Sequence, residues 1–280
     1  MDILKLINTG SERLKTNNIL SHRLDSEILL SNVLKRKREE ILINLNEQVS
    51  ANNIKKFQKI ISRRSLNEPI AYILKKKEFW SKNFIVNKNV LIPRPETELM
   101  VEKIIKIFYA KDIFILDIGT GTGCILLSIL SDLKYAKGIG IDISSKAVKI
   151  AKKNLLRLKL TNKIKFDVKA FKDIYNYKFD LIVSNPPYIM TKDLKNLKED
   201  IKKFEPKLAL DGGNDGLDVI KKVIYKSKSI LKLNGMLALE IGNGQLKKVS
   251  KILKTNKFRT RYLIRDYQEN VRCILSTLTM

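Results

Sequence analysis

The chain has 280 residues, 44% of them hydrophobic, and carries a formal net charge of +26. This length can bury one large core, or a medium core with a small accessory domain, and we expect two domains. The single histidine, His22, and two cysteines without metal-ligand spacing, Cys124 and Cys273, argue against Ser-His-Asp hydrolysis, a metal site and a disulfide framework.

The positive charge has two explanations. Phosphate neutralisation by Lys and Arg drives non-specific binding to nucleic acid. The excess is mostly lysine, however, and accompanies much Ile and Asn along the whole chain, as AT-rich codon usage would produce. Runs such as 35–38 (KRKR) and 75–77 (KKK) would favour an acidic or ribonucleoprotein partner. The chain has no signal-peptide-like start and nowhere approaches about 18 uninterrupted apolar residues, so we expect a cytoplasmic protein without a membrane partner.

The first elements of the chain are helical. Residues 1–74 place apolar side chains at helical spacing, for example Ile3 with Ile7, and predict a small N-terminal helical domain. Residues 75–95 are richer in aromatic and β-branched side chains and predict a β-ribbon linker. Its hairpin turn is expected at Asn87-Lys88-Asn89.

Residues 96–280 alternate between helix and strand patterns, which predicts an α/β domain with a mostly parallel, doubly wound sheet. Strands are expected near 113–118, 137–142, 164–168, 179–184 and 235–241. Helices are expected near 96–109, 123–133, 144–158, 216–232 and 245–255. Two further strands, 257–265 and 271–278, are separated only by a short turn and should form an antiparallel hairpin that ends a seven-stranded sheet.

A glycine-rich loop follows the first strand of this domain. In "FILDIGTGTGC" the strand leads into Gly119, Gly121 and Gly123 and then into an apolar helix. Glycines allow the backbone to approach a ligand closely, and the start of the helix favours a negative group, so a nucleotide-type ligand is implied. Cys124 stands where the dinucleotide fingerprint would place a glycine, which weakens an NAD interpretation.

An acidic residue closes the next strand. Asp142 in "GIGIDIS" would accept hydrogen bonds from both ribose hydroxyls of such a ligand. The structural alternative is that Asp142 caps the next helix, a role that Ser144 could fill instead. Asp117, at the end of the preceding strand, is expected to orient the glycine loop.

The stretch "FDLIVSNPPYIM" runs a buried strand, 179–184, into Asn185, Pro186, Pro187 and Tyr188. The prolines end the strand and make the turn rigid. The side-chain oxygen of Asn185 and the carbonyl of Pro186 would then accept hydrogen bonds from one NH2 group, and Tyr188 would offer a flat face to a planar amide or base. Such contacts would align the lone pair of a poor nitrogen nucleophile with an electrophilic methyl group, without histidine or metal.

Together these motifs resemble those of class I S-adenosylmethionine-dependent methyltransferases, and more narrowly of the release factor glutamine methyltransferases. The similarity extends over nearly the whole chain. The segments that carry it are "EPIAYIL" at 68–74, "FW" at 79–80, "LIPRPETE" at 91–98, "FEPKLALDGGNDGL" at 204–217, "LEIG" at 239–242 and "RDYQENVR" at 265–272.

The resemblance implies a Rossmann-like methyltransferase domain at 96–280 and a substrate-recognition role for 1–74. It implies that S-adenosyl-L-methionine is the cofactor and assigns its binding to Gly119, Thr120, Gly121, Thr122, Gly123, Asp142, Ala170 and Asn185. It assigns the glutamine pocket to Asn185, Pro186, Pro187 and Tyr188, with Asn185, Pro186 and Tyr188 as the catalytic residues. The segment "IPRPETE" would cover the cofactor as a lid that Arg94 and Glu96 fix, and Phe204-Glu205-Pro206 would lie on the substrate side or simply pack in their loop.

The sequence departs from the family pattern after the third strand of the sheet. Val168, Lys169 and Ala170 replace the usual Ser-Asp pair and its following apolar residue, so Lys169 stands where an acid would meet the adenine amine. A backbone contact from Ala170 is the remaining option. Lys75 also replaces a customary glycine before the ribbon.

The implied activity is methylation of the glutamine side-chain amide in the Gly-Gly-Gln motif of peptide chain release factors, a protein methylation in translation termination. We expect a monomer that needs no stably bound nucleic acid. Three alternatives remain: a glutamine methyltransferase of a large-subunit ribosomal protein, an amino-methyltransferase acting on adenine or guanine in nucleic acid, and a non-enzymatic, ribosome-associated binding module.

Overall fold

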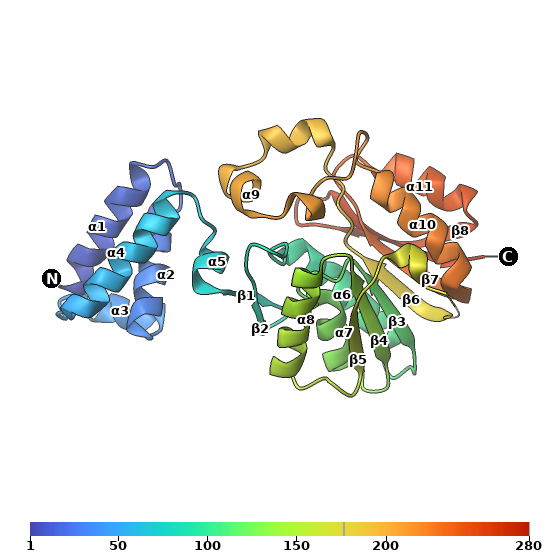
Figure 1. The fold of residues 1–280 in the computed structure, drawn as a ribbon, viewed down its shortest axis with the longest axis horizontal. Helices are drawn as coiled ribbons and strands as arrows, with labels where there is room; N and C mark the ends of the chain where they lie inside the picture. Colours follow the sequence, from blue (N-terminus) through green and yellow to red (C-terminus); the bar gives the residue numbers. More distant parts are fainter. Residues whose placement is uncertain (176, 280) are drawn as a thin grey trace. The chain divides into compact units, whose positions relative to one another are not determined.

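The computed structural model describes residues 1–175 and 177–279, and the chain forms two compact units (Figure 1). The first unit consists of Met1–Lys76 together with Lys198–Phe204. The second consists of Lys77–Leu197 and Glu205–Met280. No helix in the described ranges combines the length and the apolar character that crossing a bilayer requires.

The first unit is the small helical bundle expected from the sequence. Its helices are α1 (Ile3–Lys15), α2 (His22–Leu34), α3 (Arg38–Ile43), α4 (Ala51–Ser65), α5 (Ile70–Leu74) and, from a later part of the chain, α9 (Glu199–Phe204). Asp2 begins α1 by accepting a hydrogen bond from the amide of Lys5 at 2.8 Å. Leu6, Leu30 and Phe57 are buried together, so the helical spacing of apolar residues forms one core.

The β-ribbon consists of β1 (Lys76–Phe79) and β2 (Lys82–Ile85), and its turn is not where the sequence predicted it. Trp80 and Ser81 close the hairpin, both with left-handed φ angles of 51° and 52°. The turn prediction at Asn87-Lys88-Asn89 is therefore wrong. Those residues form a local turn after β2, in which the Asn87 carbonyl accepts from the amide of Val90 at 3.1 Å.

Tertiary contacts explain a hairpin turn without glycine or asparagine. The backbone amide of Trp80 donates to Glu98 Oε1 at 3.1 Å, and its indole Nε1 donates to Asp132 Oδ2 at 2.7 Å. These bonds hold Trp80 from two distant segments, so the turn depends on the folded domain more than on local preference.

The second unit contains the predicted seven-stranded, mostly parallel sheet. Its strands are β3 (Phe114–Ile118), β4 (Lys137–Asp142), β5 (Ile164–Val168), β6 (Phe179–Ser184), β7 (Leu231–Glu240), β8 (Phe258–Arg265) and β9 (Val271–Leu278). The spatial order is β5-β4-β3-β6-β7-β9-β8, and β8 and β9 form the expected antiparallel edge hairpin. β7 begins earlier than predicted, because Leu231 is buried and pairs with Phe179 across the sheet.

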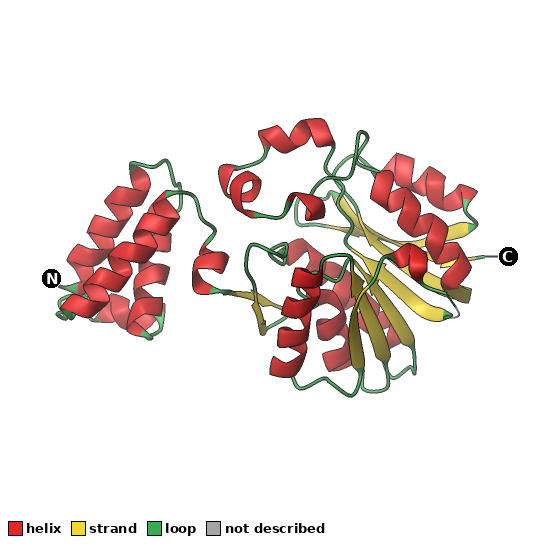
Figure 2. Ribbon diagram, viewed as in Figure 1, coloured by secondary structure: helices red, strands yellow, loops and turns green. Residues whose placement is uncertain are grey.

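Helices cover both faces of this sheet (Figure 1; Figure 2). On one face lie α6 (Pro95–Phe108), α7 (Cys124–Asp132) and α8 (Ser145–Arg157), and on the other lie α10 (Asp218–Ile230) and α11 (Leu246–Thr255). Adjacent residues of β3 enter opposite cores, Ile115 towards α6–α8 and Leu116 towards α10 and α11. Short turns of helix occupy η1 (Phe171–Asp173), η2 (Thr191–Asn196) and η3 (Lys207–Ala209). The order of strands reverses between β3 and β6, which is where open α/β sheets bind ligands.

Candidate functional site

A cavity of about 800 Å³ lies at this reversal, where β3, β4 and β6 end. Most of the site residues predicted from the sequence line it: Gly119, Thr120, Gly121, Thr122, Asp142, Ala170, Asn185, Pro186 and Pro187. Gly123 and Tyr188 do not appear among its described lining residues. The fold thus brings together segments that are far apart in the sequence.

The glycine loop forms an open cradle on one wall of the cavity. Gly119 and Gly121 have positive φ angles of 73° and 55°. A Cβ atom would meet nothing within 4 Å at Gly119, and at Gly121 only a backbone oxygen at 3.9 Å, so side chains there would fill cavity space. The amide of Gly119 donates to the carbonyl of Ile141 at 2.9 Å and fastens the loop to the end of β4.

Gly123 serves packing more than ligand access. Its φ is 80°, and an added Cβ would lie 2.9 Å from both Leu127 Cδ1 and Phe166 Cζ. Its amide donates to the Thr120 carbonyl at 2.7 Å and ends the loop where α7 begins. This glycine lets α7 pack closely against the sheet, the role that a third glycine has in related nucleotide-binding loops.

Asp142 lies between the cradle and the next helix. Its Oδ2 accepts from the amide of Gly121 at 3.0 Å, and its Oδ1 accepts from the amide of Ser144 at 2.9 Å. Burial raises the pKa of Asp142, whereas these amide hydrogen bonds lower it. Ser144 is the residue that caps α8, because its Oγ accepts from the amide of Ala147 at 3.2 Å. The carboxylate of Asp142 is therefore a lining group of the cavity and not a helix cap.

Asp117 is buried beneath the glycine loop, with 1% of its surface exposed. Its Oδ2 accepts a hydrogen bond from Thr120 Oγ1 at 2.6 Å, a contact that fits the expected role in orienting the loop. Burial is the main cause that raises the pKa of Asp117 to about 7.

The turn after β6 places Asn185 against the start of α6. Its side-chain Nδ2 donates to Thr97 Oγ1 at 3.5 Å, and Thr97 Oγ1 donates to Glu240 Oε2 at 2.5 Å. Thr97 lines the cavity, and Glu240 is completely buried at the end of β7. Neither residue was predicted as a site residue, although both lie in the family-like segments "LIPRPETE" and "LEIG", which were the available signal.

The hydroxyl of Tyr188 is bonded to the same buried carboxylate. It donates to Glu240 Oε1 at 3.3 Å and accepts from Arg272 Nη2 at 3.2 Å. The Arg272 guanidinium lies 5.8 Å from the centre of the Tyr188 ring. Burial and the nearby Glu240 carboxylate raise the pKa of Tyr188 to about 12. The aromatic face that was expected to receive a planar substrate thus has a protein partner.

The altered segment after β5 meets the cavity through Ala170 and Phe171. Lys169 has an exposed side chain that does not belong to the described cavity lining, and its amide donates to the carbonyl of Asp142 at 3.0 Å. Phe171 was not predicted from the sequence, because it follows the altered segment and shows no pattern of its own. It adds an aromatic residue to the lining of the cavity.

The segment 91–94 forms another wall of the cavity. Glu205, in the loop that follows α9, binds this segment. Arg94 Nη2 donates to Glu205 Oε1 at 2.6 Å, and the amide of Ile92 donates to Glu205 Oε2 at 3.2 Å. The Glu205 side chain is only 1% exposed. These contacts match the expected role of Arg94 in fixing this segment.

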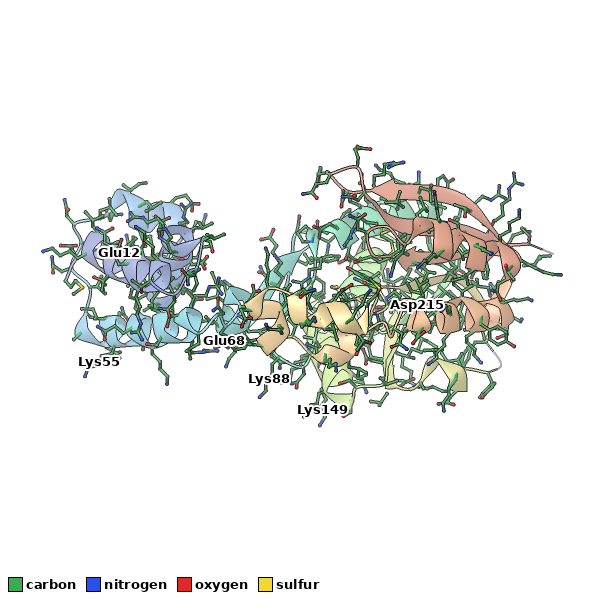
Figure 3. The ribbon with its side chains drawn as sticks, turned by 90° about the horizontal axis from the view of Figure 1, so that it is seen from above. Glu12, Lys55, Glu68, Lys88, Lys149 and Asp215 are labelled. Atoms are coloured by element: carbon green, nitrogen blue, oxygen red, sulfur yellow. The ribbon has the colours of Figure 1, made fainter. Side chains whose placement is uncertain are left out.

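The cavity mouth carries lysines and tyrosines that sequence reasoning did not single out. They are Lys172, Tyr175, Lys222, Tyr225 and Lys226. Elsewhere lysines project from outer faces, as Lys55 on α4 and Lys149 on α8 do in Figure 3. Within the described ranges, no group of three or more His, Cys, Asp or Glu side chains is arranged to hold a metal ion.

Both units of the chain are similar to known protein families. Residues 5–74 match the family described as PrmC N-terminal domain, and residues 110–273 match the family described as Methyltransferase domain. The chain is 44% identical to a release factor glutamine methyltransferase of Buchnera aphidicola subsp. Schizaphis graminum, over 90% of this chain and 93% of that protein.

A second relative is longer than this chain. The chain is 38% identical to a bifunctional methyltransferase of Rickettsia prowazekii, over 97% of this chain and 56% of that protein. It therefore spans about half the length of that curated relative. Among solved structures, the catalytic domain of hMettl16 in complex with a MAT2A 3′UTR hairpin matches with a TM-score of 0.59 and 15% identity, over 85% of this chain and 87% of that one. At this identity, the likeness shows a common fold.

Proposed function

Because this chain belongs to the release factor glutamine methyltransferase family, we propose that it methylates the glutamine side-chain amide nitrogen in the Gly-Gly-Gln motif of peptide chain release factors. The observation that carries the proposal is the cavity in which the glycine cradle, Asp142 and Asn185-Pro186 meet at the reversal of strand order. The cofactor in this proposal is S-adenosyl-L-methionine, which supplies an electrophilic methyl group when it is bound.

The cavity suits a nucleoside-containing cofactor. Gly119 and Gly121 leave open space next to the cavity, and Asp142 presents a carboxylate whose oxygens can accept from ribose hydroxyls in addition to the backbone amides they already bind. Ala170 and Phe171 provide backbone and apolar surface for a base on the same side. These residues would hold the cofactor without any metal.

Asn185 and Pro186 would hold the glutamine amide. An amide nitrogen is a weak nucleophile because its lone pair is delocalised into the carbonyl. Two hydrogen bonds, to Asn185 Oδ1 and to the Pro186 carbonyl, would fix the plane of the NH2 group and stabilise the positive charge that develops on it. In the reaction the nitrogen–carbon bond forms, the sulfur–methyl bond breaks and one amide proton is released to solvent.

The remaining parts of the proposal concern the partner and the setting. We assign recognition of the release factor to the helical first unit, which matches the PrmC N-terminal domain family. A cytoplasmic location and a monomeric state that does not depend on bound nucleic acid belong to the same proposal. Tyr188 belongs to the same proposal as a residue that completes the glutamine pocket, with its hydroxyl bonded to Glu240.

The proposal is tested by methyl transfer from labelled cofactor. Purified chain, labelled S-adenosyl-L-methionine and a release factor should give a labelled factor, and replacement of the Gln in its Gly-Gly-Gln loop should abolish the label. A large-subunit ribosomal protein and protein-free DNA or RNA serve as parallel substrates for the two enzymatic alternatives. Label that enters the factor equally well without its loop Gln contradicts the proposal, as does label that enters only one of the other substrates.

The role of Asn185 is tested in the same assay. Asn185→Ala should bind cofactor nearly as well as the unaltered chain but lower kcat by about 100-fold, the usual effect of removing one preorganised polar group. Asn256→Ala is a matched control, because it removes an amide whose Nδ2 donates to the Ile252 carbonyl at 2.8 Å at the C-terminal end of α11. Equal turnover of the two variants would exclude an orienting role for Asn185.

A further inference from the structure

A series of hydrogen bonds runs from β9 to the cavity through the buried side chains of Glu240 and Thr97 and the partly buried side chains of Arg272, Tyr188 and Asn185. It begins at Arg272, passes through the Tyr188 hydroxyl and the Glu240 carboxylate, and reaches Thr97 and Asn185. Glu240 has no exposed surface, and its two oxygens accept from different partners, Oε1 from Tyr188 and Oε2 from Thr97. The proposed reaction uses Asn185 but gives no task to this buried carboxylate.

When the Glu240 carboxylate is ionised, donor and acceptor chemistry allows only one direction along this series of hydrogen bonds. Arg272 can only donate, so the Tyr188 oxygen accepts and the Tyr188 hydrogen must point to Glu240. An ionised carboxylate only accepts, so the hydrogen of Thr97 is also directed to Glu240.

The oxygen of Thr97 is then left to accept from the amide of Asn185. The group of Asn185 that faces Thr97 must therefore be its NH2, at 3.5 Å. Asn185 Oδ1 is the amide atom that remains for a ligand in the cavity, which Asn185 lines. Because one asparagine rotamer differs from its flipped form only by exchange of O and NH2, the hydrogen-bond chain decides which atom faces the cavity.

We propose that Glu240 and Thr97 are positioning residues that set the direction of the Asn185 amide, so that its oxygen and not its nitrogen faces the substrate. The catalytic consequence rests on the proposed glutamine methylation, whereas the orientation itself does not. Burial raises the pKa of Glu240, whereas the hydrogen bond from Thr97, the charge of Arg272 and the hydrogen bond from Tyr188 lower it.

Glu240→Gln is predicted to reverse the direction of the hydrogen bonds between position 240, Thr97 and Asn185, with almost no change in side-chain shape. Tyr188 still donates, so the Gln oxygen must face Tyr188 and the Gln NH2 must face Thr97. Thr97 then accepts from position 240 and turns its own hydrogen towards Asn185. Asn185 must then accept this hydrogen bond with its oxygen, which places its NH2 group in the cavity. There it would face the NH2 group of the substrate glutamine, and neither group can accept a hydrogen bond from the other.

Variants of Thr97 distinguish reversal of the Asn185 amide from a non-specific disturbance of packing around Glu240. Thr97→Val removes the hydroxyl, so the direction of the Asn185 amide is no longer imposed but is also not reversed. Glu240→Gln should therefore slow turnover more than Thr97→Val. In the Glu240→Gln/Thr97→Val double variant no hydroxyl at position 97 can donate to Asn185, so the reversed amide orientation is not imposed. Turnover should therefore recover to the level of Thr97→Val alone. Thr97→Ser keeps the hydroxyl and should restore turnover relative to Thr97→Val.

The kinetic experiment measures kcat for release-factor methylation and the cofactor Kd by calorimetry for each variant. We expect Glu240→Gln to lower kcat by about 100-fold, comparable to loss of the Asn185 acceptor, with the cofactor Kd changed less than about threefold. Recovery in the double variant supports the proposal. Unchanged kcat in Glu240→Gln, or a double variant as slow as Glu240→Gln, overturns it.

A second measurement reads the orientation without catalysis. In protein with nitrogen-15-labelled asparagine, the Asn185 side-chain NH2 signal is identified by its loss in Asn185→Ala. In the unaltered chain its protons should show a cross-peak to Thr97, and this cross-peak should disappear in Glu240→Gln. Persistence of the cross-peak in Glu240→Gln overturns the proposal, whether or not the chain methylates release factors. A failed methylation assay with a lost cross-peak contradicts only the proposed function.

Discussion

The ion pair between Arg94 and Glu205 is predicted to stabilise the wall of the cavity mainly by neutralising a buried carboxylate. The two side chains meet at 2.6 Å, with Arg94 29% exposed and Glu205 1% exposed. Arg94→Ala would remove this cation from the buried Glu205 side chain, which would still accept from the Ile92 amide. Loss of one partner of such a pair costs about 3–5 kcal/mol, and we expect the lower end, about 3 kcal/mol, because Arg94 is partly hydrated.

Neutralising Glu205 as well should recover part of this loss. Gln at position 205 can still accept from the Ile92 amide but does not need a cation. The Arg94→Ala/Glu205→Gln double variant should thus be more stable than Arg94→Ala alone by about 1–2 kcal/mol. The sign of this difference tests the prediction, because two independent losses of stabilising contacts would make the double variant less stable than Arg94→Ala.

The measurement is equilibrium unfolding in denaturant, followed by tryptophan fluorescence. The chain contains one tryptophan, and Trp80 lies in the same compact unit as Arg94 and Glu205. The exposed pair of Glu102 and Lys106 on α6 is a matched control, for which Lys106→Ala should cost less than about 1 kcal/mol. A double variant no more stable than Arg94→Ala would refute the reasoning.

Three further predictions address the glycine loop, the cofactor and the first unit. The pKa of Asp117, raised from 3.8 to about 7, means that unfolding releases a proton between these values, so the free energy of unfolding should fall by roughly 1.4 kcal/mol per pH unit there. The stabilising contribution of Asp117 protonation, but not the stability of the whole fold, is then lost above the folded value. Denaturant unfolding between about pH 5 and 7 should show this slope, and Asp117→Asn should flatten it; an unchanged slope contradicts the cause. Asp142→Ala should weaken S-adenosyl-L-methionine binding by on the order of 100-fold in calorimetry, and unchanged affinity would exclude the ribose role. Gly10→Ala should destabilise the first unit by about 1–3 kcal/mol in denaturant unfolding followed by circular dichroism, because its Cβ would lie 2.5 Å from Ser26 Oγ and 2.7 Å from Phe57 Cζ; a loss below about 0.5 kcal/mol would show that the helices yield freely.

Most of the fold was predictable because its signals are local and periodic. The segments 114–118 and 179–184 are mostly apolar, interrupted only by Asp117, Asp180 and Ser184, as expected of strands covered on both faces. The amphipathic helices between the strands repeat at helical spacing. The ribbon turn was mispredicted because Trp80 and Ser81 carry no turn signal, and their left-handed conformation is held by Glu98 and Asp132. The inclusion of α9 in the first unit also leaves no trace in local sequence patterns.

Some site residues could likewise be predicted from the sequence and others could not. Gly119, Asp142 and Asn185 could be selected because each directly follows or ends a strand, and the carboxyl ends of parallel strands converge. Thr97 and Glu240 could not be given a role from their positions, because the hydrogen bond that joins them spans 143 residues and the bond from Asn185 to Thr97 spans 88.

Sequence patterns place a side chain at an edge of the sheet, but they do not determine which of its atoms faces the cavity. For Asn185 that choice depends on donor and acceptor constraints that begin at Arg272, on the opposite side of the buried carboxylate. A substitution of one carboxyl oxygen by NH2 at position 240 changes neither hydrophobic pattern nor volume, yet it should invert these constraints. The reactivity of this site therefore depends on hydrogen-bond direction, a property that exists only in the assembled domain.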